Sequence, residues 1–408
     1  MSYIRNIAIL FSSNSLGTLL NFIFLPILSR IYLPEYFGVL AYFLSISLII
    51  GMLVTLKFEN IFFIDTEKPN EIMVLIIISI ITIELISLIV LSIFWSFNFL
   101  INDGTLIIYI LIYTFFLGLY YAGRAYLSSI GSFKKISQGY LLKILISNLF
   151  FLFGSYIFKP NAKLLIIGTI IGQFSETIYL LSNFRIKDLI KVADAAILKN
   201  YVIRYKNFPL FTLPGELLGN INSQLPVFFL SSAFGNTITG YYSLVQRLIG
   251  IPLKLLTSSS AEVFRSEAAK KFKYNNSFKD LALKTSKYLF LLALVIGIVL
   301  FFASDYLIPI FLGKEWFNTI PFLKVMIILF VFQFSVSPIS YGLYVAEKQK
   351  VDFFWQLTLV IICFLSLFIS IKNFNAINTV FVYSLCYSLM YIVYFFLIIS
   401  NSERKNVI

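Results

Sequence analysis

Histidine is absent from this 408-residue sequence, and cysteine occurs only twice. The lack of histidine excludes histidine-dependent nucleophilic triads, histidine metal sites and histidine proton relays. Both cysteines, Cys363 and Cys386, fall inside apolar runs, where isolated thiols act as packing residues. Two thiols alone cannot complete a zinc site. We therefore predict no cofactor and no metal.

Charged residues are also scarce, at 12% of the chain, whereas a soluble domain has roughly a quarter. Apolar residues make up 59%, and the mean hydropathy is +0.91. This is enough apolar sequence for about twelve transmembrane helices of about 20 residues each. The net charge of +13 does not indicate nucleic-acid binding, because the basic residues lie between apolar runs rather than on a soluble domain. The composition therefore predicts a polytopic helical membrane protein.

Apolar runs of spanning length form two sets of six. The first set lies near 7–29, 36–56, 72–95, 106–127, 140–158 and 164–182. The second set lies near 208–230, 238–258, 286–312, 317–344, 353–371 and 377–399. We predict an all-α membrane protein with two six-helix bundles, at 1–182 and 208–408, joined by a cytoplasmic connector at 183–207.

The basic residues are distributed asymmetrically over these connections. Of the 32 Lys and Arg, 24 lie on or within about one helical turn of one set of alternate connections, 5 lie on the other set, and 3 lie deeper within spans. By the positive-inside rule, both termini are predicted to be cytoplasmic. The first run contains Asn14 and Asn21 and no small-residue cleavage site, so we expect a retained helix rather than a signal peptide.

The connector at 183–207 interleaves basic and apolar residues. This pattern suits an amphipathic helix lying against anionic lipid headgroups. An ordinary solvated connection explains it equally well, and both interpretations remain open.

Shifting the sequence by 202 residues aligns the two halves weakly. In this register the matched pairs are Gly17 with Gly219, Gly38 with Gly240, Asn14 with Glu216, Thr18 with Asn220 and Asn21 with Ser223. The polar members of each half share one helical face, so both halves begin with a helix that carries a polar stripe. In hydrocarbon such a stripe must face the protein interior or a watery cavity. The alignment predicts parallel repeats about an axis along the membrane normal.

The eighth run carries Arg247 and Lys254 on one helical face. A cation at this depth costs several kcal/mol unless it is paired or hydrated. One interpretation is a structural ion pair with an acid inside the spans, namely Glu84, Glu176 or Glu216. The other is a cationic wall that receives an anionic substrate. Each of the three acids is in turn a candidate for either an ion pair or a coupling-ion site.

Residues 29–38, with the sequence SRIYLPEYFG, resemble the first-loop signature of polysaccharide-biosynthesis flippases. These are the O-antigen translocases of Wzx type, within the multidrug/oligosaccharidyl-lipid/polysaccharide exporter superfamily. Residues 56–60, with the sequence LKFEN, resemble a basic–aromatic–acidic step of that family, and residues 208–264 are similar to its second-half pattern. The resemblance extends over the whole chain in topology.

The resemblance implies two helical bundles around a central cavity in the bacterial inner membrane. It implies a substrate that is an oligosaccharide on undecaprenyl pyrophosphate, moved from the cytoplasmic to the periplasmic leaflet. Its partners would be this lipid-linked oligosaccharide, membrane lipids and other polysaccharide assembly proteins. The candidate substrate-binding residues are Arg247, Lys254, Arg30, Lys324, Asn14, Asn21 and Asn220.

Two other functions are alternatives to a flippase. A polysaccharide polymerase or ligase is an enzyme that needs a sizeable outer loop, whereas the longest outer connection here, near 96–105, has about ten residues. A cation-coupled drug or small-molecule antiporter of the same superfamily would use a coupling carboxylate such as Glu84 or Glu176. The basic residues of the eighth run and the 29–38 signature favour the sugar-lipid substrate.

Overall fold

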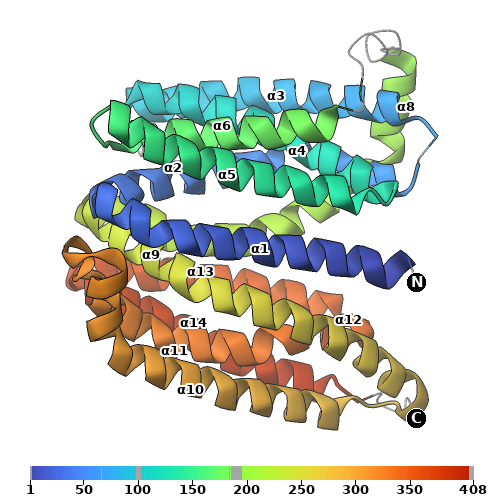
Figure 1. Ribbon diagram of the computed structural model, residues 1–408. Coiled ribbons are helices and arrows are strands. Elements are labelled where there is room, and N and C mark those ends of the chain that lie inside the picture. Colours follow the sequence, from blue (N-terminus) through green and yellow to red (C-terminus); the bar gives the residue numbers. More distant parts are fainter. Residues whose placement is uncertain (1, 66, 98–102, 183, 185–194, 404–408) are drawn as a thin grey trace. The chain divides into compact units, whose positions relative to one another are not determined.

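The computed structural model describes residues 2–65, 67–97, 103–182, 184 and 195–403. Within these ranges almost all residues are helical, and no strand occurs beyond an isolated bridge between Ser277 and Glu403. The membrane-length helices and their bounds are α1 (Ser2–Ile31), α2 (Pro34–Leu53), α3 (Pro69–Ser96), α4 (Gly104–Ser129), α5 (Phe133–Ile157), α6 (Ala162–Leu181), α9 (Leu213–Asn275), α10 (Lys279–Leu312), α11 (Thr319–Val336), α13 (Gln349–Asn373) and α14 (Ala376–Ser400) (Figure 1).

All twelve predicted runs fall on helices. Nine described helical segments are long and apolar enough to cross a membrane, and α1 adds a shorter apolar stretch, Leu16–Ile31. The remaining two runs form the two arms of α9, at 213–234 and 236–275, which meet at Gly235. Gly235 has φ 82° and ψ 177°, a conformation that interrupts the helix and that glycine adopts without strain. The predicted all-helical, multi-pass membrane fold is confirmed.

Shorter elements fill the connections. These are η1 (Phe58–Phe63), α8 (Ala195–Arg204), η2 (Phe208–Thr212), η3 (Lys314–Trp316), η4 (Ser337–Ser340) and α12 (Tyr341–Val345). The helix α8 covers the second half of the predicted connector, and 185–194 lie outside the described residues.

The chain separates into two compact units. Unit 1 contains Met1–Tyr32 and Val39–Asn220, and unit 2 contains Leu33–Gly38 and Ile221–Ile408. The predicted boundaries at 183–207, and the central cavity between bundles, stay predictions.

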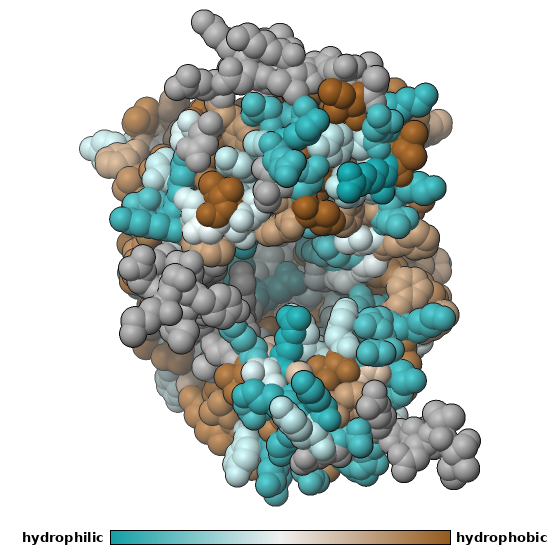
Figure 2. Space-filling view, turned by 90° about the vertical axis from the view of Figure 1, so that its right-hand side faces the viewer, coloured by the Kyte–Doolittle hydropathy of each residue, from teal (hydrophilic) through white to brown (hydrophobic). Residues whose placement is uncertain are grey.

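In unit 1, α3 shows why these helices need a membrane. Ile76 and Ile80 are fully buried against the unit, whereas Leu85 and Ile89 are more than half exposed. A helix that is apolar on both its buried and its exposed faces is stable where the exposed face meets lipid. The remaining packing of unit 1 pairs α5 with α6 and α1, and α4 with α6 and α3. Figure 2 views the end where α4 finishes and α5 begins, and hydrophilic residues gather over it.

In unit 2, α11 packs against α10 and α14, and α14 packs against α13. The start of α2 belongs to this unit because it lies against the second arm of α9 at a very close backbone approach. A Cβ on Gly38 would lie 1.8 Å from the Asn236 carbonyl oxygen, and a Cβ on Gly240 would lie 1.9 Å from the Pro34 carbonyl oxygen. Pro34 and Asn236 are themselves related by the 202-residue shift, so the two contacts are reciprocal. This reciprocity supports the weak repeat seen in the sequence.

Candidate functional site

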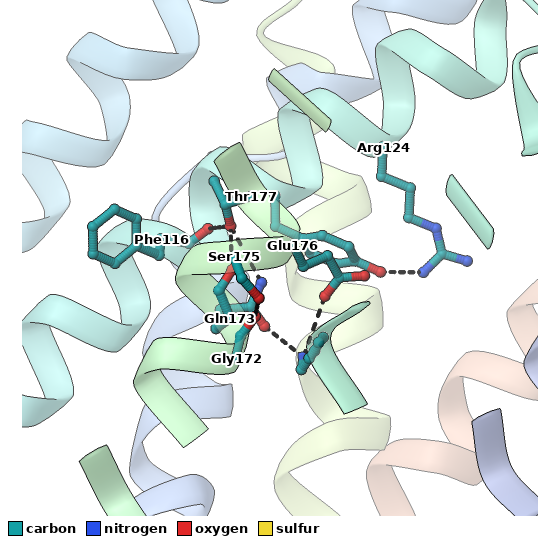
Figure 3. A network of polar contacts seen from close by, with 9 residues as sticks. Phe116, Arg124, Gly172, Gln173, Ser175, Glu176 and Thr177 are labelled. Carbon is teal, nitrogen blue, oxygen red and sulfur yellow. Dashed lines mark hydrogen bonds and ion pairs between the residues drawn. The ribbon is translucent and has the colours of Figure 1, made fainter. Parts of the chain in front are cut away.

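An intramembrane network of polar side chains connects α5 and α6 in unit 1 (Figure 3). The Lys143 ammonium lies 3.5 Å from a carboxylate oxygen of Glu176 and donates a 2.5 Å hydrogen bond to Gln173 Oε1. Gln173 and Glu176 are three residues apart and therefore share one face of α6. The Glu176 side chain is only 1% exposed, whereas that of Lys143 is 25% exposed. The pair thus couples a buried carboxylate to a cation that reaches the protein surface.

The close approach of α5 to α6 depends on Gly172. A Cβ at this position would lie 1.8 Å from Ser147 Oγ and 2.9 Å from the Lys143 carbonyl oxygen. On the other side of α6, the Thr177 hydroxyl donates to the carbonyl oxygens of Gln173 and Phe116, which ties α6 to α4. The network therefore sits on a rigid three-helix contact.

Arg124 on α4 extends this network toward solvent. Its guanidinium donates a 2.8 Å hydrogen bond to the Tyr120 hydroxyl and lies 5.9 Å from the ring centroid, while Lys143 lies 5.8 Å from the same centroid. Arg124 is exposed, and within the described ranges it forms no ion pair with a carboxylate. Two cations and one carboxylate leave a net positive charge, which suits an anionic group such as a phosphate.

Glu84, the second predicted acid, lies elsewhere in unit 1. Its Oε1 accepts a 2.6 Å hydrogen bond from the Thr114 hydroxyl of α4. The other carboxylate oxygen, Oε2, is buried and has no hydrogen-bond partner within the part of the chain that is described.

Glu216, the third acid, pairs with Lys57, whose ammonium lies 2.7 Å away. Lys57 is buried, has φ 62°, and also lies 3.7 Å from Glu59. Burial raises the pKa of the Glu59 carboxyl, and a hydrogen bond from Thr55 and the Lys57 charge oppose the shift. The short connection after α2 is thus held to the start of α9 by a cation that serves two carboxylates.

Arg247 lies on the second arm of α9 in unit 2 and is half-buried. Its guanidinium lies 5.7 Å from the ring centroid of Phe37, which packs edge-on against Trp316 at 5.2 Å. Among the described residues, no carboxylate forms an ion pair with Arg247. The acids proposed as its partners are engaged with Lys57, Thr114 and Lys143 instead. Among the described residues, nothing supports the ion-pair interpretation of Arg247, and substrate contact at Arg247 stays a prediction.

The other predicted cations are placed differently. Lys324 on α11 lies 2.8 Å from both carboxylate oxygens of Asp305 on α10 and 5.1 Å from the Phe301 ring centroid. The Asp305 carboxylate thus neutralises the charge of Lys324. Arg30 is exposed at the end of α1. Lys254 lies on α9, but its side chain is outside the described part of the structure.

The polar stripes are partly visible. Asn21 Oδ1 accepts a 3.1 Å hydrogen bond from Asn148 Nδ2 on α5, and Asn220 donates a 3.0 Å bond to the Glu216 carbonyl oxygen. The side chain of Asn14 lies outside the described residues. Asn21 therefore takes part in a contact between α1 and α5, whereas the bond of Asn220 lies within its own helix. The exposure of both stripes to substrate stays a prediction.

Four residues of the network were not among the predicted site residues, namely Arg124, Tyr120, Lys143 and Gln173. Arg124 and Lys143 lie inside the predicted runs 106–127 and 140–158. A cation inside a predicted span, even about one turn from its end, is the signal that identifies them.

Comparison with known sequences identifies related proteins. The family described as Polysaccharide biosynthesis protein matches residues 27–321. The capsular polysaccharide biosynthesis protein CapF of Staphylococcus aureus is 25% identical over 379 residues, which cover 88% of this chain and 89% of that protein. The teichuronic acid biosynthesis protein TuaB of Bacillus subtilis (strain 168) is 23% identical over 180 residues, which cover 44% of this chain and 37% of TuaB.

Solved structures share the fold. The lipid II flippase MurJ in an inward closed conformation has a TM-score of 0.76 and 16% identity, over 95% of this chain and 87% of MurJ. An inward-facing multidrug resistance MATE family transporter of the MOP superfamily has a TM-score of 0.66 and 13% identity, over 94% of this chain and 93% of the transporter. At these identities the likeness concerns the fold.

Proposed function

Because this chain belongs to the polysaccharide biosynthesis protein family, we propose that it is a flippase for a lipid-linked oligosaccharide. The substrate is an oligosaccharide on undecaprenyl pyrophosphate, which the protein moves from the cytoplasmic to the outer leaflet by alternating access. The asymmetry of Lys and Arg supports a cytoplasmic-membrane location with both termini in the cytoplasm. The names of CapF and TuaB, both polysaccharide biosynthesis proteins, support the substrate class.

The observation that best supports this proposal is the position of the Arg247 cation within a predicted span. A guanidinium within a membrane span is costly unless a partner relieves the cost, and the described residues supply only the face of Phe37. A pyrophosphate offers two adjacent oxygens that match the planar fork of an arginine. Arg247 is therefore the anchor for the phosphate part of the substrate.

The network in unit 1 supplies a second cationic group. Arg124 is exposed and free of an ion pair within the described ranges, and Lys143 is shared between Glu176 and Gln173. When a phosphate arrives, Lys143 can turn from Glu176 toward the new anion, because the pair distance of 3.5 Å is long for a charge-assisted hydrogen bond. Binding and release then change the pairing of Glu176, which couples substrate occupancy to the α5–α6 contact.

Deletion of the gene in the organism that carries it tests the proposal. Surface polysaccharide should be lost, and the lipid-linked oligosaccharide should accumulate in the membrane. Reintroduced Arg247→Ala should not restore the polysaccharide, and Arg247→Lys should restore part of it, because lysine keeps the charge and loses the fork. Lys372→Ala is the matched control, since Lys372 is an exposed cation that lies over Phe368. Normal polysaccharide without the gene, or no accumulated lipid-linked intermediate, would contradict the proposal.

A further inference from the structure

Unit 2 contains a cavity of about 660 Å³ that the flippase proposal does not use. It lies between the second arm of α9, the η4–α12 segment and the facing ends of α13 and α14. Its volume falls in the range of about 300–1,000 Å³ that is typical of small-molecule sites. The connections next to these helix ends are basic and contain Lys270, Lys271, Lys348 and Lys350. By the positive-inside rule, the mouth of the cavity is therefore expected on the cytoplasmic side.

A buried carboxylate forms the floor of this cavity. Asp352 is only 5% exposed. The Tyr394 hydroxyl donates to its Oδ1, while the Gln356 amide at 2.8 Å and the Tyr344 hydroxyl at 3.3 Å donate to its Oδ2. Among the described residues it has no cationic partner within ion-pair distance. A carboxylate can accept about four hydrogen bonds, so Asp352 keeps capacity for a further donor from a ligand.

Aromatic rings form the walls. Trp355 stacks on Tyr394 with centroids 3.8 Å apart, and its indole N–H donates to the Met390 carbonyl oxygen, so the ring is held in place. At the rim, Tyr344 is 50% exposed and Tyr341 is also exposed. Rings of this kind present negative faces that attract polarised C–H groups.

Further polar groups complete the lining. Arg265 and Glu262 stand at the exposed rim, and Ser337 and Ser340 line the wall. The Arg265 guanidinium lies 5.4 Å from the Tyr341 ring centroid, which limits its movement. Hydroxyls, an amide, two carboxylates and a guanidinium together both donate and accept hydrogen bonds around aromatic surfaces.

This composition distinguishes between possible ligands. A hydrophobic drug would leave Asp352 and its donors without new partners. A metal ion is disfavoured because the described residues contain no group of three acidic, cysteine or histidine ligands. A pyranose ring fits both features, because its hydroxyls pair with carboxylate, amide and guanidinium while its C–H face lies on an aromatic ring.

We propose that this cavity is a subsite for a sugar of the oligosaccharide, which Asp352 and Gln356 bind by their hydrogen bonds and Tyr344 contacts with its ring face. The inference rests on the proposed function and adds to it a place where the cytoplasmic glycan is recognised before translocation. Specificity for the sugar then resides in this cavity, at residues other than the pyrophosphate anchor Arg247.

Calorimetric titration of the purified full chain in lipid nanodiscs tests this subsite. The probe is the free oligosaccharide of one repeat unit, released from the organism's own polysaccharide by mild acid. Asp352→Asn and Tyr344→Ala should each weaken binding by roughly tenfold or more, since each removes a polar or ring contact to the sugar. Tyr274→Ala should bind as the wild type does, because Tyr274 is 76% exposed on α9 and is not among the residues that line the cavity. Tyr344 is at the rim, so this variant keeps the test valid if Asp352→Asn does not fold.

Two results would overturn the subsite. One is an unchanged oligosaccharide affinity in both variants, or no binding by the wild type. The other is binding of Na⁺ alone that Asp352→Asn abolishes while the oligosaccharide affinity stays unchanged. A parallel titration with inorganic pyrophosphate separates the two proposals. Loss of pyrophosphate binding in Arg247→Ala but not in Asp352→Asn supports the anchor at Arg247 and its separation from the sugar subsite. Sugar binding by a protein that does not bind pyrophosphate would overturn the anchor and leave the subsite intact.

Discussion

Replacement of Gly240 by alanine should disrupt the tight packing of α9 against the start of α2. The new Cβ would lie 1.9 Å from the Pro34 carbonyl oxygen, which is 1.5 Å short of an ordinary contact of 3.4 Å. The clashing atom belongs to the backbone and cannot rotate away, so the two helices must separate. Overpacking of this kind costs about 1–3 kcal/mol.

The assay is thermal unfolding of the purified protein in detergent. If unit 2 unfolds as one body, a loss of this size lowers the Tm by roughly 2–12 °C. Gly250→Ala is the control on the same helix, because a Cβ there meets no atom within 4 Å. Alanine is favoured over glycine in a helix by about 1 kcal/mol, so this variant should be as stable as the wild type or more so. An unchanged Tm in Gly240→Ala would refute the close approach, and with it the reciprocal contact that supports the repeat.

Three further variants test local electrostatics. Lys143→Met leaves Glu176 buried without its cation, which costs about 3–5 kcal/mol and should reduce the yield of folded protein. Adding Glu176→Gln to this variant should restore the yield. An unchanged yield of Lys143→Met alone would contradict the ion pair. Burial raises the pKa of Glu59, so its ionised form destabilises the fold above the unfolded pKa of about 4.3, and Glu59→Gln should have an equal or higher Tm at pH 8 but not at pH 4. The backbone N–H of Thr105 donates to Asp103 and lowers the pKa of this carboxyl group. This N-terminal cap of α4 stabilises the fold by about 1 kcal/mol above the unfolded pKa of about 3.9, so Asp103→Ala should lower the Tm at pH 7. The difference in Tm between the variant and the wild type should shrink as the pH falls through the lowered pKa of Asp103.

The twelve spans were predictable because the energy of apolar burial in lipid depends on composition over about 20 residues. Each predicted run lies on a helix. The two runs on α9 are separate arms, as predicted, but the form of their junction was not predictable by this criterion. It depends on the backbone conformation of Gly235, and a glycine in a short polar stretch is equally compatible with a loop.

The chemistry of the site was only partly predictable. The cost of charge in a membrane identified Arg247 and the three acids as residues that require partners. It could not identify the partners, because Lys57 and Glu216, like Lys143 and Glu176, meet only after helices distant in sequence have packed together. Asp352 was not predicted for a related reason. It is recognisable as a binding group only once the hydrogen bonds from Tyr394, Gln356 and Tyr344 are known.

Flipping in reconstituted vesicles is the most direct test of the central claim. A fluorescent undecaprenyl-pyrophosphate oligosaccharide is placed in the inner leaflet of proteoliposomes, and its appearance in the outer leaflet is followed with a membrane-impermeant quencher. Wild-type protein should accelerate the transfer well beyond protein-free vesicles, Arg247→Ala should reduce it to the background rate, and Arg247→Lys should fall between them. Transfer by Arg247→Ala at the wild-type rate, or none by the wild type, would contradict the claim that Arg247 anchors a lipid-linked oligosaccharide during its passage.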